Sequence, residues 1–375
     1  MDKNPEFCIP KPSRHLIMTP NGIPRSFISK RSHINTIHRT AHLHPLLSII
    51  AAHKKHRQPS LRWIDAKPIA RTTPPMKAHI YALLFISHTA VQLTHAQPMP
   101  FQQHPSTNQQ WELVSALSDE FDSDTLDATR WDIHHHPWGD RAWRSHNVWQ
   151  SDGNVRIQAD YHPHRGKNNN RYYYTTGMLQ SRQQITYGYV EARIKAADIF
   201  PGFTTAFWLY SNGSRNPQFP HITYAEIDIV ELLQGLWNRE TRKNNKPNYI
   251  DCNLHTREIQ NGVEIWRRPE QWPEICENHY EAPFDPRDGF HIYACENTPE
   301  KITWFIDGIP VASVTNHNWH LPMTLTINLE PRPPLIRWGK PGEQDRVPVR
   351  RASTSKGFPI TAEVDYIRVW KPLEK

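Results

Sequence analysis

Short runs of alternating apolar and polar residues recur along the chain from Trp111 onward. Examples are residues 154–159, 187–194, 301–306 and 363–370. Successive side chains of a β-strand point to opposite faces, so these runs predict half-buried strands. Long helical periodicity is nearly absent. The pattern therefore predicts an all-β fold, a β-sandwich formed by a single domain of about 200–250 residues.

Turn and composition signals set the limits of this domain. Asp307-Gly308 follows one of these runs and is a strong hairpin-turn signal. Residues 97–110 are rich in Gln and Pro and are predicted to form a linker, which leaves residues 111–373 for the sandwich. Within it, residues 234–288 are polar and weakly periodic. An insertion of this length is more often functional than idle.

An export signal is predicted inside the chain, at residues 76–96. Met76-Lys77 supplies a start and a positive charge, residues 80–86 begin an apolar core, and Thr94-His95-Ala96 resembles a cleavage site with small residues at its first and last positions. This is the layout of a secretory signal peptide. We expect residues 1–75 to be a disordered or non-native upstream extension, and the mature protein to be secreted or periplasmic.

The alternative for this segment is a transmembrane anchor. Its apolar run is short against the ~20 residues that span a bilayer. The run also carries His88 and Gln92. We therefore expect no membrane association once the signal has been cleaved.

The charge of the chain is unevenly distributed. The total is +7, but residues 1–96 hold 14 Lys/Arg and 3 Asp/Glu, whereas residues 97–375 hold 30 and 34. The basic character belongs to the leader, and the remainder carries a net charge of −4. A nucleic-acid-binding body, which a basic total would ordinarily suggest, is therefore disfavoured.

The segment from Glu226 to Glu231 carries three carboxylates in six residues. On a regular strand Glu226 and Asp228 share a face, and Glu231 points to the other. One extra residue, a β-bulge at Ile229/Val230, returns Glu231 to the face of the other two. We expect this bulge, and with it a strand with three carboxylates on one side.

Closely spaced carboxylates repel one another, which raises at least one pKa and separates their roles. This suits retaining glycoside hydrolysis, in which one carboxylate attacks the anomeric carbon and a protonated one donates to the leaving oxygen. The alternative interpretation is an acidic strand edge that prevents aggregation. The abundant tryptophans favour the enzyme, because sugar rings stack on indole faces, although some of these rings will belong to the core.

The six residues resemble the signature E-x-D-x-x-E of glycoside hydrolase family 16 in its bulged form. The resemblance implies that Glu226 is the nucleophile, Asp228 assists it and Glu231 is the acid/base. It also implies a concanavalin-like jelly-roll sandwich, with the signature strand in a concave face that forms a substrate cleft or tunnel.

Within that family the chain looks most like the κ-carrageenases, over about residues 111–371. The similar blocks are Tyr173-Tyr174-Thr175-Thr176-Gly177, residues 187–195, Phe200-Pro201-Gly202, residues 206–211, Asn253-Leu254-His255, Trp266-Arg267-Arg268-Pro269, residues 284–291, residues 302–308, Phe358-Pro359 and residues 363–370. The Phe-Asp-Pro-Arg and Trp-x-Arg-Pro blocks narrow the resemblance to this branch.

The resemblance implies cleavage of the β-1,4 bond of κ-carrageenan, a sulfated galactan. Sulfate recognition needs cationic donors in a fork, which favours arginine. The matching positions give a predicted substrate-binding set: Arg215, Arg268 and Arg332 for sulfate, Trp208 and Trp266 for stacking, His255 near the cleavage point, and Trp143 with Asn147 at the distal end.

Two features depart from the family's pattern. Asn328-Leu329-Glu330 replaces the expected run before Arg332, and Glu330 adds an anion near a proposed sulfate site. That anion favours less sulfated or hybrid galactans such as furcellaran. Three cysteines of the body lie outside the positions of the family's bridge, and at most one internal disulfide is possible: Cys252, Cys276 and Cys295.

No cofactor is required for this chemistry, and no catalytic metal is expected. In the family, segments such as Asp119-Glu120-Phe121-Asp122 and Asp365 often bring a structural Ca²⁺ to the sandwich, and calcium needs six or more oxygens. His134-His135-His136 is interpreted as an exposed loop cluster, because neighbouring strand residues point to opposite faces. The protein is expected to be a monomer.

Three functions remain open at this point. The first is an endo-acting retaining hydrolase of a sulfated galactan, and the second keeps the chemistry on agarose, porphyran, furcellaran or laminarin. Arginines Arg215, Arg268 and Arg332 facing a cleft near the nucleophile would favour a sulfated substrate. The third is a non-catalytic carbohydrate-binding sandwich, which an intact carboxylate triad argues against.

Overall fold

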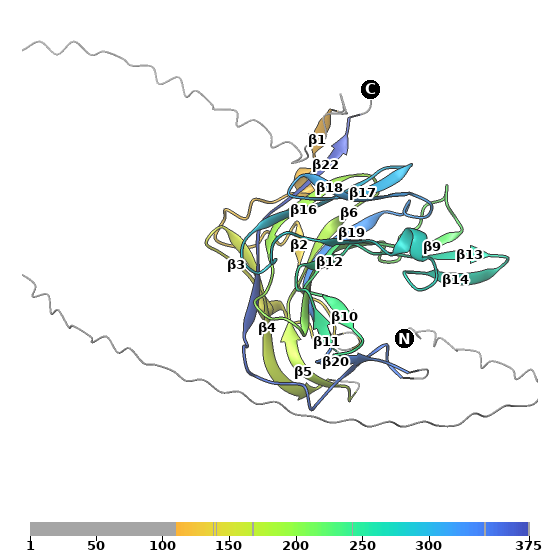
Figure 1. Ribbon diagram of the computed structural model, residues 1–375. Coiled ribbons are helices and arrows are strands. Elements are labelled where there is room, and N and C mark those ends of the chain that lie inside the picture. Colours follow the sequence, from red (N-terminus) through yellow and green to blue (C-terminus); the bar gives the residue numbers. More distant parts are fainter. Residues whose placement is uncertain are drawn as a thin grey trace, which may run out of the picture. The chain divides into compact units, whose positions relative to one another are not determined.

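The computed structural model describes residues 110–373 except 138, 140, 167, 168, 242, 341 and 342. Two nine-stranded antiparallel sheets lie face to face in this part of the chain (Figure 1). The predicted all-β sandwich is thereby confirmed. The upstream extension, the signal peptide and all but the last residue of the linker lie outside the described residues and stay predictions.

The first sheet has the strand order β18-β17-β16-β7-β22-β4-β3, with β1 beside β22 and β5 beside β4. Its strands are β1 (Trp111–Leu113), β3 (Val148–Ser151), β4 (Asn154–Arg165), β5 (Arg171–Thr176), β7 (Gly188–Lys195), β16 (His291–Asn297), β17 (Lys301–Ile306), β18 (Ile309–Thr315) and β22 (Ile360–Pro372).

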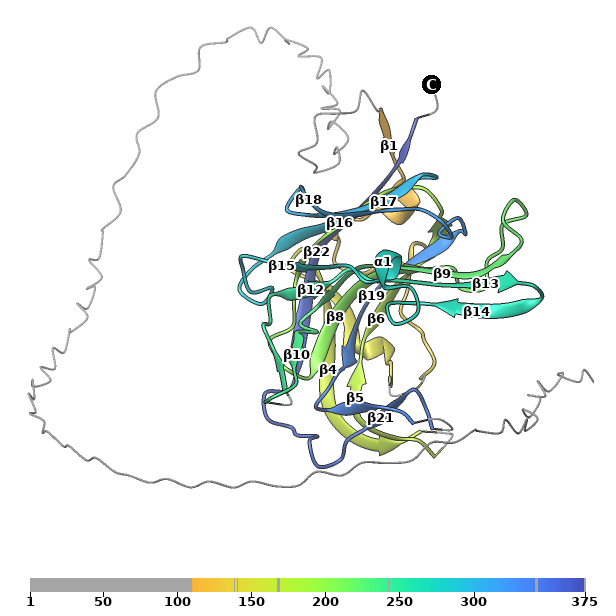
Figure 2. The same cartoon turned by 45° about the vertical axis from the view of Figure 1, so that its right-hand side comes forward.

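The second sheet has the order β14-β13-β9-β8-β19-β6-β2, with β12 paired to both β9 and β15. Its strands are β2 (Trp131–Asp132), β6 (Met178–Ile185), β8 (Phe203–Tyr210), β9 (Ile222–Leu232), β12 (Tyr249–Asp251), β13 (Leu254–Gln260), β14 (Val263–Arg267), β15 (His279–Glu281) and β19 (Met323–Pro331). The β13–β14 hairpin projects away from the sandwich in both views (Figure 2).

Two small hairpins and three short helical turns complete the described chain. They are β10 (Leu236–Asn238) with β11 (Lys243–Asn245), β20 (Ile336–Trp338) with β21 (Arg346–Pro348), the 3-10 turns η1 (Ser115–Leu117) and η2 (Ser145–Asn147), and the helix α1 (Pro273–Cys276). No helix within the described ranges is long and apolar enough to span a bilayer.

The core lies between the sheets and follows the period-two pattern of the strands. On β9, Ile227 and Ile229 are fully buried on the side away from the carboxylates. All nine residues of β19, Met323–Pro331, are buried, which places the middle of the second sheet at the centre of the molecule. Burial of such side chains stabilises the fold by about 1.5–3 kcal/mol each.

Three of the four alternating runs named above lie wholly in a strand, and the run 187–194 begins one residue before β7. Asp307 and Gly308 both have positive φ in the turn after β17. The region 234–288 is less irregular than its composition suggests. It contains β10 to β15 and α1, and its strands β12 and β13 extend the second sheet beside β9. Short strands with few apolar residues gave no clear period, so the sequence did not predict these strands.

Candidate active site

Strand β9 carries the predicted bulge. Trp208 of β8 is paired with Asp228, but the residue before it, Phe207, is paired with Val230. Ile229 is therefore the extra residue, as expected at this point of the signature. The extra residue shifts the register of β9 by one position relative to β8 beyond this point.

The bulge leaves the three carboxylates on the side opposite the buried isoleucines. The side chains of Glu226, Asp228 and Glu231 are 18%, 7% and 12% exposed, respectively. They are thus largely enclosed but open to solvent at one edge. This is the arrangement that the signature predicted.

His255 of β13 joins the first two carboxylates. Its Nε2 lies 3.2 Å from Oδ2 of Asp228 and 3.7 Å from Oε1 of Glu226. Burial alone would lower the pKa of the His255 imidazole, but Glu226 and Asp228 outweigh burial and raise that pKa to about 9. The imidazolium places a positive charge against the predicted nucleophile.

Asp228 is the most buried of the three carboxylates. Burial, followed by the negative charge of Glu231, raises the pKa of its carboxyl to about 8, against the opposing hydrogen bond from His255. Asp228 and His255 therefore hold a shared proton to a higher pH than the same groups would in water. A protonated Asp228 removes one negative charge from beside Glu226, so fewer like charges oppose each other there.

The backbone of the same residues is held from several directions. The indole Nε1 of Trp304 donates to the carbonyl oxygen of Asp228 at 2.9 Å, and that of Trp319 donates to the carbonyl of Glu226 at 2.8 Å. The Asp228 amide donates to the Asn253 carbonyl at 3.0 Å. The backbone at Glu226 and at Asp228 is thereby fixed.

Tyr224 also reaches the predicted nucleophile. Its hydroxyl donates to Oε2 of Glu226, two residues along the same strand. Burial and then the charge of Glu226 raise the pKa of the phenol well above its ordinary value, so it remains a donor. The sequence analysis did not identify Tyr224, although its spacing from Glu226 puts both side chains on one face of β9.

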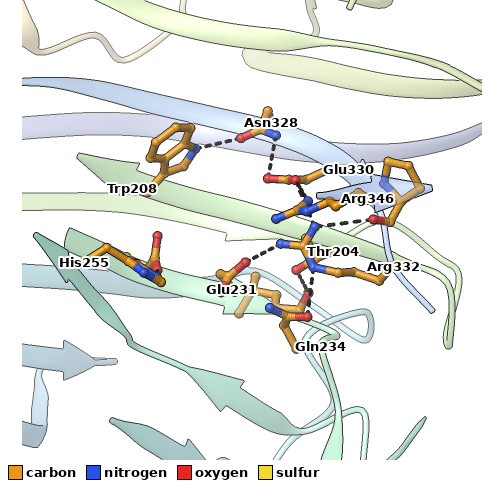
Figure 3. Close-up of polar contacts among 12 residues, drawn as sticks. Thr204, Trp208, Glu231, Gln234, His255, Asn328, Glu330, Arg332 and Arg346 are labelled. Carbon is orange, nitrogen blue, oxygen red and sulfur yellow. Dashed lines mark hydrogen bonds and ion pairs between the residues drawn. The ribbon is translucent and has the colours of Figure 1, made fainter. Parts of the chain in front are cut away.

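Glu231 is bound on its other side by Arg332, which follows β19 (Figure 3). Nη2 of Arg332 contacts Glu231, Nη1 lies 2.9 Å from Oε2 of Glu330, and Nε donates to Oε1 of Gln234 at 2.9 Å. The Arg332 side chain is 1% exposed. The predicted sulfate ligand is thus buried against the predicted acid/base.

The two predicted stacking residues lie on either side of β9, Trp208 on the neighbouring strand β8 and Trp266 on β14, beyond β13. Trp208 of β8 stands opposite Asp228 in the sheet register, and its ring stacks on Tyr210 with centroids 4.6 Å apart. Trp266 of β14 lies 6.3 Å from the His255 ring and 5.5 Å from that of Tyr224. Both indoles are half-buried and so keep an exposed part.

The other two predicted sulfate ligands are more open. Arg215 is exposed, and its Nη1 donates to the carbonyl of Thr223 at 3.0 Å, three residues before Glu226. Arg268 has its guanidinium carbon 5.9 Å from the Trp266 ring centroid, and its Nε is 3.1 Å from Glu270. Both remain candidates for contact with an anionic substrate.

A further arginine, Arg257, was missed by the sequence analysis. Its guanidinium lies 4.3 Å from the centroid of Trp266, in a cation–π contact. It follows His255 by two residues on β13, so the two side chains share a face. That spacing was the available signal.

The predicted distal pair lies on the first-sheet side of the molecule. Asn147 is fully buried, and its Nδ2 donates to Oδ2 of Asp160 at 2.5 Å and to the Gln158 carbonyl at 3.2 Å. Trp143 is half-buried, and its backbone bridges to Thr176. A fully enclosed amide does not line an open subsite, so the structure gives Asn147 a structural environment instead.

Comparison with known proteins places the chain in a family. A family model described as the GH16 domain of β-porphyranases A–D matches residues 111–372. The chain belongs to glycoside hydrolase family 16. Membership in this family explains both the bulge in β9 and the three carboxylates that the strand carries.

Several individual relatives of this family 16 hydrolase are known. The κ-carrageenase of Pseudoalteromonas carrageenovora is 35% identical over 315 residues, which cover 81% of this chain and 74% of that protein. The β-porphyranase B of Zobellia galactanivorans is 27% identical over 250 residues, 64% of this chain and 82% of the other.

Solved structures agree with the jelly-roll sandwich that the resemblance implied. The P. carrageenovora κ-carrageenase in complex with an oligotetrasaccharide of κ-carrageenan has a TM-score of 0.63 and 34% identity, over 72% of this chain and all of that one. A κ-carrageenase from Z. galactanivorans has a TM-score of 0.64 and 32% identity, over 74% and 100%. This hydrolase is therefore κ-carrageenase-like.

Three of the four carboxylates that could hold a structural calcium in this family 16 hydrolase are engaged by other side chains: Asp119, Glu120 and Asp365. Oδ2 of Asp119 accepts the indole N–H of Trp131 at 2.9 Å, and Glu120 makes two 2.8 Å contacts with Arg368. Asp365 pairs with Arg193 at 2.5 Å. Calcium binding there would require some of these pairs to open.

The remaining candidate chemistry has ordinary surroundings. Cys252, Cys276 and Cys295 are buried free thiols. His134 and His136 are exposed as expected, but His135 is half-buried, with Nε2 3.1 Å from the Asp132 carbonyl. Among the described residues, one group has metal-like spacing, with ligand atoms within 4.8 Å: Glu226, Asp228 and His255.

Proposed function

We propose that the protein is a secreted, endo-acting, retaining hydrolase that cleaves β-1,4 linkages of a sulfated galactan, with κ-carrageenan as the first candidate. The observation that carries the proposal is the bulged strand, which groups Glu226, Asp228 and Glu231 beside His255. The identity of 35% to a κ-carrageenase supports the substrate.

The proposed reaction uses two of the carboxylates directly. Glu226 attacks the anomeric carbon while Glu231 donates its proton to the leaving glycosidic oxygen, and a glycosyl-enzyme ester forms. Water, deprotonated by Glu231, then cleaves the ester and returns Glu226 to its starting state. The product keeps the β configuration because two inversions occur.

The neighbouring residues prepare the nucleophile. The His255 imidazolium and the Tyr224 hydroxyl stabilise the negative charge that Glu226 must carry to attack. Asp228 holds the His255 ring through its 3.2 Å contact. Glu226 is thereby oriented before the substrate arrives.

Substrate binding is assigned to the exposed groups around this centre. The half-buried rings of Trp208 and Trp266 offer faces for sugar stacking. Three arginines supply cationic donors near these rings and strand β9. Arg215 is bonded to the Thr223 carbonyl of β9, and Arg257 and Arg268 contact the ring of Trp266. A sulfated chain fits a site with more than one such donor.

The second candidate is a porphyranase, since the matching family model describes β-porphyranases. Furcellaran, agarose and laminarin remain candidate substrates of the same retaining hydrolysis. Glu330 no longer argues for a less sulfated galactan, because it is buried and paired with three arginines: Arg141, Arg332 and Arg346.

The test is hydrolysis of a polysaccharide panel by the purified protein. Reducing ends are measured on κ-carrageenan, furcellaran, porphyran, agarose and laminarin, and the product anomer is followed by proton NMR. We expect oligosaccharides with β anomers first, at the highest kcat/KM on κ-carrageenan. Cleavage of porphyran alone would favour the second candidate, and no cleavage of any sulfated galactan would refute the main proposal.

The nucleophile is tested by Glu226→Gln, with Glu191→Gln as the matched control. Glu191 is a fully buried glutamate of β7 in the first sheet. Glu226→Gln should lose at least about 1,000-fold in kcat with an unchanged fold. Retained turnover in this variant would contradict the assigned role.

A further inference from the structure

Glu330 is the centre of a buried charge cluster. Its Oε2 lies 2.6 Å from Nε of Arg141 and 2.9 Å from Nη1 of Arg332, and it also contacts Nη1 of Arg346. Glu330 itself is 4% exposed. Burial alone would raise the pKa of its carboxyl, but the three arginines hold that pKa well below its ordinary value.

The cluster reaches two residues of the proposed active site (Figure 3). On one side Oε1 of Glu330 accepts from Nδ2 of Asn328 at 3.3 Å, and Asn328 in turn accepts the indole N–H of Trp208 at 2.7 Å. On the other side Arg332 bridges Glu330 to Glu231. A continuous polar chain thus connects a proposed sugar platform with the proposed acid/base.

Arg332 has no free edge for a substrate sulfate. Each of its three guanidinium nitrogens is engaged, by Gln234, Glu330 and Glu231. Withdrawing it toward a ligand would leave the buried Glu330 carboxylate with one cation fewer, and an uncompensated buried charge is strongly destabilising. The geometry therefore assigns this arginine to the protein, not to the substrate.

We infer that Glu330 and Arg332 are positioning residues for Glu231, and that the three-arginine cluster holds the acid/base carboxylate in its working orientation. Buried ion clusters contribute little net stability, so specificity of geometry is the physical reason to keep one. The planar fork of Arg332 fixes two carboxylates and an amide at once, which a lysine cannot do.

The inference rests on the proposed function, and two measurements separate them. The first is a double-variant cycle on thermal stability, with Glu330→Gln, Glu231→Gln and the pair. Arg332 keeps one carboxylate in each single variant and neither in the pair. The loss of Tm in the pair should therefore exceed the sum of the single losses by about 2 °C or more.

The second measurement is kinetic. In Glu330→Gln we expect kcat on the polysaccharide that the wild type cleaves to fall at least about tenfold, with KM within about twofold, because only the chemical step loses orientation. On a dinitrophenyl glycoside of the matching oligosaccharide the first step needs no proton donor. The pre-steady-state release of dinitrophenolate should therefore stay within about threefold of wild type.

Control variants keep the test decisive. Glu191→Gln removes another fully buried carboxylate, 3.9 Å from Arg368 in the first sheet, and should lower Tm without any dependence on the leaving group. If Glu330→Gln does not fold, Arg332→Lys replaces it, because it keeps the charge but loses the fork. In its cycle with Glu231→Gln the pair should lose less Tm than the sum of the single losses, because both variants remove the same contact.

Each result bears on a different idea. A wild type that cleaves no polysaccharide refutes the proposed function, while the stability cycle still tests the link between Glu330 and Glu231. Additive Tm losses would overturn the link. A rise in KM alone, confined to sulfated substrates, would make Arg332 a sulfate ligand, and equal losses on both kinds of leaving group would reduce the cluster to a structural role.

Discussion

Trp304 of the first sheet donates its indole N–H to the backbone carbonyl of Asp228 in the second, at 2.9 Å. This bond fills an interruption in the strand pairing. On that side of β9 the register stops at the Leu254–Ile227 pair and resumes only at Asp251–Glu231. A buried carbonyl without a partner costs about 1–3 kcal/mol, so the indole stabilises the bulge that the carboxylates need.

Trp304→Phe should therefore impair catalysis more than binding. The phenyl ring keeps most of the packing but cannot donate, so the bulge loses its support from the other sheet. We expect kcat to fall about tenfold with KM nearly unchanged, and the free energy of unfolding to fall by about 1–3 kcal/mol. Steady-state kinetics and chemical denaturation measure the two effects.

Trp131→Phe is the control for this variant. Trp131 is equally buried, and its indole donates at 2.9 Å to Asp119, not to β9. It should lose similar stability and keep its kcat. Equal losses of kcat in both variants would show that Trp304 has no special relation to the bulge.

The pairing of Asp228 with His255 predicts how stability depends on pH. Both folded pKa values, about 8 and about 9, lie above those of the unfolded chain. The folded state therefore binds more protons, and stability must fall as pH rises through these values. The contribution of His255 is fully present below about pH 6.5 and is lost by about pH 9.

We expect the Tm of the wild type to decline between pH 6.5 and 9. In His255→Gln this decline should be shallower, because the imidazolium is absent at every pH. Activity should decrease over the same range as Asp228 and His255 lose their protons. A Tm profile of the same slope in both proteins, measured by scanning calorimetry, would contradict the assignment.

The exposed arginines predict a salt-dependent KM. Removal of the charge in Arg268→Ala should raise KM on a sulfated galactan about fivefold at low ionic strength, and less at high salt, where screening weakens the contact. On neutral agarose the variant should match the wild type. The control is Arg165→Ala, because Arg165 is an exposed residue of β4 bound to Asn169. An identical change on both polysaccharides would count against sulfate recognition.

The signature strand could be predicted from sequence because its information is local. Period-two alternation placed Glu226 and Asp228 on one face, and the bulge followed from the spacing to Glu231. The same alternation also puts Tyr224 on the face of Glu226 and Arg257 on the face of His255, each two residues away. These two were missed because neither belongs to a signature with a known role.

The environment of Arg332 could not be predicted in the same way. The family resemblance suggested a sulfate ligand, but the burial of Arg332 depends on its surroundings. Arg141, far upstream in the chain, and Arg346 of β21 meet it at Glu330. Asn147 shows the same limit, because its partner Asp160 is brought to it by the pairing of β3 with β4. Residue type alone does not show which polar groups the fold encloses.

The hydroxyl of Tyr224 leads to a last prediction, on the nucleophile itself. The phenol donates to Glu226, so Tyr224→Phe removes one of the bonds that orient the attacking carboxylate. We expect kcat to fall about tenfold to 100-fold, with a small change of KM, since the ring can still pack 5.5 Å from Trp266. The control is Tyr187→Phe, whose hydroxyl lies 2.8 Å from His320 and not beside a carboxylate of the site. Equal losses of kcat in both tyrosine variants would contradict a role of the Tyr224 hydroxyl in orienting Glu226.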